Sequence, residues 1–257
     1  MIFDAEGVVI DTEKAWDRGQ HELLARRGIT YDRDEVKPLL TGRDLIEGTR
    51  LLKRTFHLRD TTADLVSERL RLVSGFFTSS VDFVPGFEDF YNVVSATYPT
   101  GLATALDPQL FELVDKKLSL RSRFHEHVIT LTDVGHVSKP APDLFLASAR
   151  QLAVDPQQCL VIEDSPLGIE AAHRARMLAV GLTTTYDRHA LAQADVVVQS
   201  FGDIPWPLTA VTLMRGKHRQ QTAASGRTKL MLTLPPRMAK RSHDGTTSGK
   251  SRPSTAS

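Results

Sequence analysis

The chain has 257 residues, enough to bury a sizeable core as one large domain or two smaller ones. Its hydrophobic content of 41% and charged content of 25% are ordinary for a globular protein, and no apolar run approaches the roughly 18–20 residues that span a bilayer. The single cysteine, Cys159, excludes an internal disulfide and fits a reducing compartment. With no basic-then-apolar leader at the start, these features predict a cytoplasmic protein that is not embedded in a membrane.

The net charge of +1 hides an asymmetry between the two parts of the chain. Residues 207–257 hold ten basic residues and one acidic residue, which leaves 22 basic and 30 acidic residues in 1–206. This basic C-terminal tail is rich in Ser, Thr and Gly, so we predict that residues 207–257 are disordered. It lacks the interleaved aromatic residues of a nucleic-acid-binding segment, which disfavours nucleic acid as a partner. Nothing in the sequence specifies an oligomeric state.

The first predicted strand, at residues 2–3, leads at once into two acids and a glycine. Apolar residues at helical spacing then predict helices over 13–27, 34–40, 44–56 and 62–77. Pro85-Gly86 marks a return to the main domain. We therefore predict a helical domain over 13–83, inserted into a core domain formed by 1–12 and 84–206.

From residue 87 predicted helices alternate with predicted strands. Strands are expected over 101–104, 128–131, 159–162, 179–182 and 196–198, and helices over 87–95, 108–117, 143–152, 167–175 and 188–193. This alternation is typical of a parallel sheet wound on both sides, and the short apolar runs suit strands buried on both faces. The predicted fold class is α/β, a Rossmann-like parallel sheet with helices on both faces and an inserted helical domain.

Two carboxylates stand at the end of the first strand. Asp4 and Glu6 are followed immediately by Gly7. Open α/β sheets bind ligands at the carboxyl ends of their strands, and like charges this close are costly unless a cation or a proton lies between them. A strand that runs into an ordinary polar turn would give the same pattern, so these residues alone favour an active site over a turn only slightly.

Three later segments strengthen the case. The first, residues 98–107 (YPTGLATALD), contains a small strand that ends at Thr104. The second, residues 137–145 (VSKPAPDLF), places Lys139 before a proline-braced helix start. The third, residues 159–172 (CLVIEDSPLGIEAA), contains a strand that ends in Glu163-Asp164. The four motifs, in this order and at this spacing, resemble the haloacid dehalogenase superfamily. The nearest subgroup is that of β-phosphoglucomutase and phosphoglycolate phosphatase. The resemblance covers residues 1–204 and implies that 13–83 is a cap domain.

The resemblance implies a role for each motif in phosphoryl transfer. Asp4 matches the nucleophile that carries the phosphoryl group as an aspartyl-phosphate. Thr104 matches a hydroxyl that donates to a phosphoryl oxygen, and Ala105 follows where many relatives have another small polar residue that contacts the phosphate. Lys139 matches the ammonium that pairs with Asp4 and the phosphate.

The resemblance also implies a Mg²⁺ site. Mg²⁺ prefers oxygen ligands and keeps several waters, so Asp4, Asp164 and the carbonyl of Glu6 form a sufficient set. Glu163 either contacts the ion or orients a water. In the cap, Thr41-Gly42-Arg43 is similar to a substrate loop of relatives, and Arg43 is a candidate for a second phosphate or carboxylate on the substrate or an ordinary surface arginine.

Glu6 departs from the resembled family, which usually has Asp at this position. Glu keeps the general acid and extends it by one methylene, and a displacement of about 1 Å costs ~10²-fold in rate. Glu6 therefore predicts an altered or slowed phosphatase, unless it contributes only its carbonyl to the metal. A second departure is Arg176, where relatives often have glycine before the methionine.

These observations lead to one main hypothesis and two alternatives. The main hypothesis is a Mg²⁺-dependent phosphatase that acts on a small phosphorylated metabolite of the sugar-phosphate or phosphoglycolate type. A sugar phosphomutase of the same family is the first alternative. The second is a phosphate-binding or regulatory relative that has lost efficient turnover.

Overall fold

The computed structural model describes residues 1–41, 43–204, 209–210 and 232–233. Its main sheet has the strand order β5-β4-β1-β6-β7-β8, and every neighbouring pair is parallel. The strands are β1 (Ile2–Phe3), β4 (Gly101–Ala103), β5 (Val128–Ile129), β6 (Leu160–Glu163), β7 (Leu178–Leu182) and β8 (Val196–Val198). The predicted parallel α/β sheet is confirmed.

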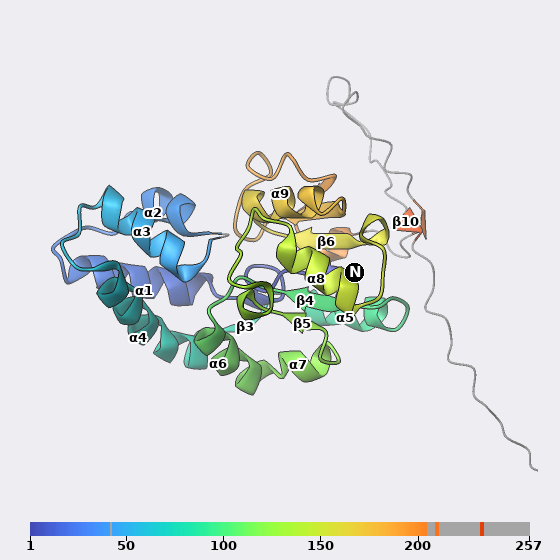
Figure 1. The fold of residues 1–257 in the computed structure, drawn as a ribbon, viewed down its shortest axis with the longest axis horizontal. Coiled ribbons are helices and arrows are strands. Elements are labelled where there is room, and N and C mark those ends of the chain that lie inside the picture. Colours follow the sequence, from blue (N-terminus) through green and yellow to red (C-terminus); the bar gives the residue numbers. More distant parts are fainter. Residues whose placement is uncertain (42, 205–208, 211–231, 234–257) are drawn as a thin grey trace, which may run out of the picture.

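Helices cover both faces of this sheet (Figure 1). One side carries α5 (Phe87–Ser95), α6 (Pro108–Leu118) and α7 (Leu120–Arg123), and the other carries α8 (Asp143–Gln151) and α9 (Pro166–Arg174). Along β6, Leu160 and Ile162 join the apolar cluster under the first set, whereas Val161 joins the cluster under the second. Side chains of a strand alternate between faces, so both layers are built from one apolar run.

The two residues of β1 lie at the centre of the fold. Ile2 pairs with Gly101 on one side and with Val161 on the other. Phe3 is fully buried and meets the rings of Phe87 and Phe124, each 5.8 Å away between centroids. Edge-on aromatic contacts of this kind stabilise a core beyond the area that they bury. A strand of two residues is thereby held firmly enough to position Asp4.

The inserted helices lie beside the sheet (Figure 1, blue to teal). They are α1 (Glu13–Ala25), α2 (Arg33–Leu40), α3 (Leu45–Thr55) and α4 (Thr62–Ser80). They share a separate apolar cluster that includes Leu23, Leu52 and Leu65. Where the chain leaves the core and returns to it, β2 (Ile10–Asp11) pairs antiparallel with β3 (Asp82–Phe83), a pair that the sequence did not reveal.

Some expectations differ from the structure. The predicted helix over 188–193 is wrong, because this segment forms turns in which Asp187 accepts from Ala190 and His189 accepts from Ala192. Six residues give too few hydrogen bonds to offset the cost of starting a helix. The short helix α7 and the 3-10 turns η1 (Leu131–Val134), η2 (Pro156–Gln158) and η3 (Phe201–Asp203) were not predicted.

The predicted tail falls mostly outside the described residues. Within it, the structure describes β9 (Thr209–Ala210) and β10 (Leu232–Thr233), which pair antiparallel where disorder was expected. No described helix is both long and apolar enough to cross a membrane.

Arg176 occupies a backbone conformation that favours glycine. Its φ is +61°, and it follows the C-terminus of α9 in a Schellman arrangement, with Met177 donating to the Ala172 carbonyl and Arg176 to that of His173. A side chain in this left-handed region costs about 1–2 kcal/mol. We expect Arg176→Gly to raise the free energy of unfolding by about 1 kcal/mol, measured by urea denaturation.

Arg150→Gly is the matched control, because Arg150 is an exposed residue inside α8. Glycine there should lower the free energy of unfolding by about 1 kcal/mol. If both variants shift stability in the same direction, the strain assigned to Arg176 is contradicted.

Candidate active site

Three neighbouring strands end at the same edge of the sheet and carry polar residues there. Asp4 follows β1, Thr104 follows β4, and Asp164 follows β6, whose last residue is Glu163. Each of these side chains is at least nine-tenths buried. Parallel strands bring their carboxyl ends together, which explains why residues 160 positions apart in the chain share one site.

Lys139 joins two of the carboxylates. Its ammonium is buried and donates to Asp4 Oδ1 and, over 2.5 Å, to Glu163 Oε1. It lies just before α8, and the pairing with Asp4 that the sequence predicted is present. A buried charge is tolerated only when it is paired, so Lys139 and the acids depend on one another.

One ammonium does not balance the acids around it. Asp4, Glu163 and Asp164 each place a carboxylate oxygen within 4.8 Å of the others. Burial raises the pKa of Asp4 to about 7, although the charge of Lys139 opposes this increase. Burial and the negative charges of Glu163 and Asp4 hold the pKa of Asp164 well above its usual range. A divalent cation would relieve this repulsion, and an all-oxygen donor set suits Mg²⁺. The residues present therefore fit the predicted metal.

Asp164 is placed by a close approach of two loops. A Cβ added to Gly7 would meet Asp164 Oδ2 at 1.8 Å, and Gly7 has a φ of +69°. Only glycine combines that backbone conformation with this lack of bulk. Thr185 hydrogen-bonds the Asp164 carboxylate from the core side. Gly7, which follows Asp4 and Glu6, thus makes room for Asp164 at the end of β6.

Glu163 is held differently from its neighbour. Its Oε2 accepts from the backbone N–H groups of Asp164 and Ser165 and from the Ser165 hydroxyl, each over 2.9 Å. Its other oxygen accepts from Lys139. Unlike Asp4 and Asp164, Glu163 does not line the cavity described below. This carboxylate therefore anchors Lys139 and the first turn of α9.

The Glu6 carboxylate turns toward the inserted helices. Its Oε1 accepts from the Thr12 hydroxyl over 2.9 Å and from the Trp16 indole N–H over 2.6 Å. Burial raises the pKa of Glu6, and these two hydrogen bonds oppose the increase. Glu6 is not in the group of acids that surrounds Asp4 and Asp164. The Glu6 side chain therefore lies between these three acids and helix α1.

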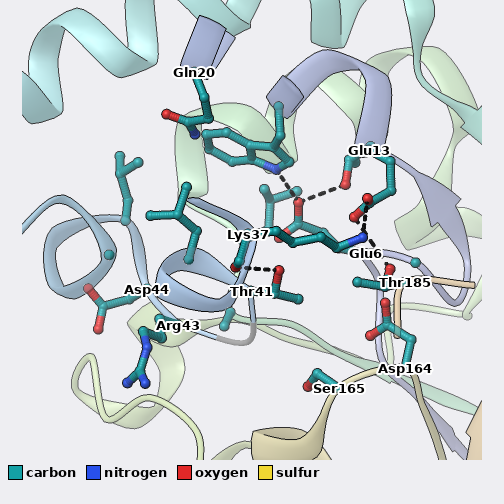
Figure 2. Close-up of a pocket in the computed structure, with 18 of the residues that line it drawn as sticks. Glu6, Glu13, Gln20, Lys37, Thr41, Arg43, Asp44, Asp164, Ser165 and Thr185 are labelled. Atoms are coloured by element: carbon teal, nitrogen blue, oxygen red, sulfur yellow. Dashed lines mark hydrogen bonds and ion pairs between the residues drawn. The ribbon is translucent and has the colours of Figure 1, made fainter. Parts of the chain in front are cut away.

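A cavity extends from these acids to the inserted helices (Figure 2). Asp164 and Ser165 lie at one end, Gln20 lies at the other, and Glu6 lies between them. Thr104, Ala105, Lys139 and Arg43 also line the cavity, so the predicted substrate residues come together, while Gly42 lies outside the described residues. Arg43 Nη1 donates to Glu47 over 2.8 Å, whereas its buried Nε has no hydrogen-bond partner among the described residues.

Sequence reasoning named Arg43 from the inserted helical segment but missed three other residues of that segment that line the cavity. Trp16, Gln20 and Arg69 line it, and none of the three belongs to a recognised motif. A signal was present in the spacing: Arg69 lies four residues after Leu65 and four before Val73, and Gln20 lies three before Leu23. These polar residues therefore stand on the apolar stripes of their helices, where burial is expected.

The comparisons agree with this site. Residues 1–176 match the family of haloacid dehalogenase-like hydrolases. The chain is 31% identical over 215 residues to the validoxylamine A 7'-phosphate phosphatase of Streptomyces hygroscopicus subsp. limoneus, covering 80% of this chain and 95% of that protein. It is 30% identical over 186 residues to a fructose-1-phosphate phosphatase of Escherichia coli (strain K12), covering 70% of this chain and 94% of the relative.

A solved structure extends the comparison to the fold. The β-phosphoglucomutase of Clostridium difficile superposes with a TM-score of 0.65 at 25% identity, covering 80% of this chain and 92% of the other. The chain belongs to the haloacid dehalogenase-like hydrolase family and is a phosphatase, as the motifs predicted.

The contact of Gly168 with Glu163 gives a test of the acidic edge. A Cβ at residue 168 would lie 1.7 Å from Glu163 Oε1. We expect Gly168→Ala to lower the free energy of unfolding by about 1–3 kcal/mol and to lower phosphatase turnover, because the displaced carboxylate no longer anchors Lys139.

Gly75→Ala is the control, because nothing lies within 4 Å of a Cβ at this exposed position inside α4. Its free energy of unfolding, measured by urea denaturation, should rise by about 0.5–1 kcal/mol, and its turnover should equal that of the native chain. Equal stability and turnover in native protein and Gly168→Ala would contradict the anchoring role.

Proposed function

We propose that the chain is a Mg²⁺-dependent phosphatase that hydrolyses a small phosphorylated metabolite through an aspartyl-phosphate on Asp4. The observation that carries this proposal is the position of Asp4. It is buried at the carboxyl edge of the sheet, bonded to Lys139 and close to Asp164, and it lines a cavity large enough to extend into the cap. A carboxylate in this setting is suited to attack phosphorus.

The relatives support a sugar or polyol phosphate as the substrate class. Their names specify validoxylamine A 7'-phosphate, fructose 1-phosphate and glycerol 3-phosphate. These are phosphate monoesters of polyhydroxylated carbon skeletons, and we extend that class to this chain. The phosphoglycolate type has weaker support, from a neighbour of 16% identity that shares the fold.

In the proposed mechanism Asp4 Oδ attacks the phosphorus atom and the bond from phosphorus to the alcohol oxygen breaks. Glu6 donates a proton to that leaving oxygen, and the raised pKa of its buried carboxyl favours the protonated form. Glu6 then takes a proton from a water whose oxygen attacks the aspartyl-phosphate. This releases inorganic phosphate and restores Asp4.

The remaining residues would bind and orient the phosphoryl group. Thr104 is buried beside Asp4's strand, with its Oγ1 accepting from the Leu106 N–H, so its hydroxyl hydrogen is left to donate to a phosphoryl oxygen. Lys139 offsets repulsion between Asp4 and the phosphate. Asp4, Asp164 and the Glu6 carbonyl would hold Mg²⁺, with Glu163 as a further candidate ligand. The ion supplies charge neutralisation at the phosphate.

We further propose that residues 13–83 act as a cap over the site, on a core formed by 1–12 and 84–206. The support is that the cavity is lined from both parts of the chain. Such a cap excludes bulk water during transfer and favours small substrates over proteins. A cytoplasmic location stays a prediction from the sequence.

The nucleophile and the metal are tested together with p-nitrophenyl phosphate. We expect Mg²⁺-dependent release of p-nitrophenol by the native chain, loss of at least about 10³-fold in Asp4→Asn, and loss on addition of EDTA that excess Mg²⁺ restores. Asp89→Asn, an exposed residue of α5, is the control and should keep native turnover. Turnover in folded Asp4→Asn equal to that of the native chain would contradict the proposal.

Glu6 is tested by comparing leaving groups. An alkyl phosphate needs a proton on its departing oxygen, whereas p-nitrophenolate departs without one. We expect Glu6→Gln to lower kcat/KM, which reports on attack by Asp4 and departure of the alcohol, by about 10²–10³-fold for glycerol 3-phosphate and by less than about tenfold for p-nitrophenyl phosphate. Glu35→Gln, on the exposed side of α2, should change neither.

Equal losses of kcat/KM for both substrates would show that Glu6 does not protonate the leaving oxygen. Conversion of glucose 1-phosphate to glucose 6-phosphate without release of phosphate would instead support the mutase alternative, for which the structural similarity to a β-phosphoglucomutase is the specific observation.

A further inference from the structure

The cap end of the cavity contains two buried polar side chains that the proposed chemistry does not use. Gln20 on α1 and Arg69 on α4 both line the cavity and are 2% and 3% exposed. Among the described residues, neither polar side-chain atom of Gln20, the amide nitrogen or the oxygen, has a hydrogen-bond partner, and Nε of Arg69 has none either. Buried polar groups are nearly always hydrogen-bonded, so these atoms point to a ligand.

The two residues lie next to each other. α1 and α4 pack closely enough that a Cβ on Gly19 would meet Val73 Cγ1 at 2.3 Å. Gln20 follows Gly19 directly, and Arg69 lies one helical turn before Val73. Arg69 also stacks over the Trp16 ring, 5.4 Å from its centroid. The unpartnered atoms therefore gather on one patch of the cavity wall.

Their distance from the reacting end follows from α1. Trp16 donates to Glu6, beside the acids, and Gln20 lies four residues further along the same helix. Four residues of α-helix rise about 6 Å. A substrate whose phosphate lies at Asp4 would therefore reach Gln20 and Arg69 with the part of its skeleton that is remote from the phosphate.

We propose that Gln20 and Arg69 form a subsite for the hydroxyl groups of a polyol or sugar monophosphate, at the end of the substrate remote from its phosphate. The amide of Gln20 must both donate and accept, and the guanidinium of Arg69 can only donate. A hydroxyl is the group that satisfies both residues. This assignment rests on the proposed phosphatase function and narrows its substrate class.

The charges of the cavity disfavour a second anionic group at this end. Its lining includes seven acidic and four basic residues: Asp4, Glu6, Glu13, Asp17, Asp44, Asp107 and Asp164 against Lys37, Arg43, Arg69 and Lys139. Lys37 is paired with Glu13, and Arg43 with Glu47. Arg69 donates to two neutral acceptors, the Leu45 carbonyl and Thr49 Oγ1. Burial lowers its pKa to about 9, so the guanidinium stays charged at neutral pH, and it is the excess of acidic residues in the lining that disfavours an anion here.

Three phosphates of similar length test the subsite: D-glucitol 6-phosphate, n-hexyl phosphate, which lacks the hydroxyls, and 6-phosphogluconate, which adds a carboxylate. We expect kcat/KM of the native chain for glucitol 6-phosphate to exceed that for hexyl phosphate by at least about tenfold. Gln20→Leu and Arg69→Met should each reduce this ratio about tenfold, mainly through KM for glucitol 6-phosphate.

Matched controls come from exposed positions. Arg71→Met lies on the same helix as Arg69, and Gln157→Leu lies in η2; both should keep the native ratio. Thermal unfolding verifies that each variant is folded, and Arg69→Lys replaces Arg69→Met if the latter unfolds, with a smaller loss expected. The ratio of the native chain is informative without any variant.

Two results would overturn the subsite. One is a native ratio near one, or a ratio that Gln20→Leu and Arg69→Met leave unchanged. The other is a tenfold preference for 6-phosphogluconate over glucitol 6-phosphate that Arg69→Met removes, which would assign Arg69 to an anionic group.

Failure of the phosphatase proposal remains distinguishable. If the native chain does not turn over p-nitrophenyl phosphate, the same ligands are titrated calorimetrically into the Asp4→Asn chain. A tenfold tighter Kd for glucitol 6-phosphate than for hexyl phosphate would then support the subsite on a protein that does not catalyse hydrolysis. Equal affinities would overturn the subsite.

Discussion

The structure depends on one buried ammonium among carboxylates that repel one another. Lys139 bonds Asp4 at the end of β1 and Glu163 at the end of β6, while Asp164 remains beside them without an ammonium of its own. Two adjacent strands, the start of α8 and the start of α9 are tied together through this contact. The excess of negative charge that remains at this edge is what the proposed Mg²⁺ ion would offset.

The same contact explains how so short a strand serves as the centre of the sheet. β1 has only Ile2 and Phe3, yet it pairs on both sides, and the Phe3 ring is enclosed by aromatic residues of the helical layer. Burial of Ile2 and Phe3 holds the strand in the core, and Lys139 holds the Asp4 carboxylate at the end of the strand. A carboxylate held in this way keeps one position, which is the condition for its proposed role as the nucleophile.

The cavity is lined by residues from two parts of the chain, the core and the inserted helices. The core contributes Asp4, Thr104, Lys139 and Asp164, and α1 and α4 contribute Trp16, Gln20 and Arg69. Glu6 lies at the junction, because it follows Asp4 closely in sequence while its carboxylate is bound by Thr12 and Trp16 of the neighbouring segment. The longer side chain, which departs from the usual Asp of the resembled family, reaches this donor pair, so the acid and the cap are coupled through hydrogen bonds.

The sequence by itself determined the fold class, the family and the residues at the edge of the sheet, because these depend on local patterns: strands that end in Asp4, Thr104 and Glu163-Asp164, and a lysine before a proline-braced helix. Only the tertiary structure decided that Glu163 anchors Lys139 and that Glu6 turns to Trp16, because both depend on contacts across the fold. The same holds for the turns at 188–193, where residues of good helical preference are too few to offset the cost of starting a helix. Gln20 and Arg69 stood on the apolar stripes of their helices, yet their shared patch arises only when α1 packs against α4.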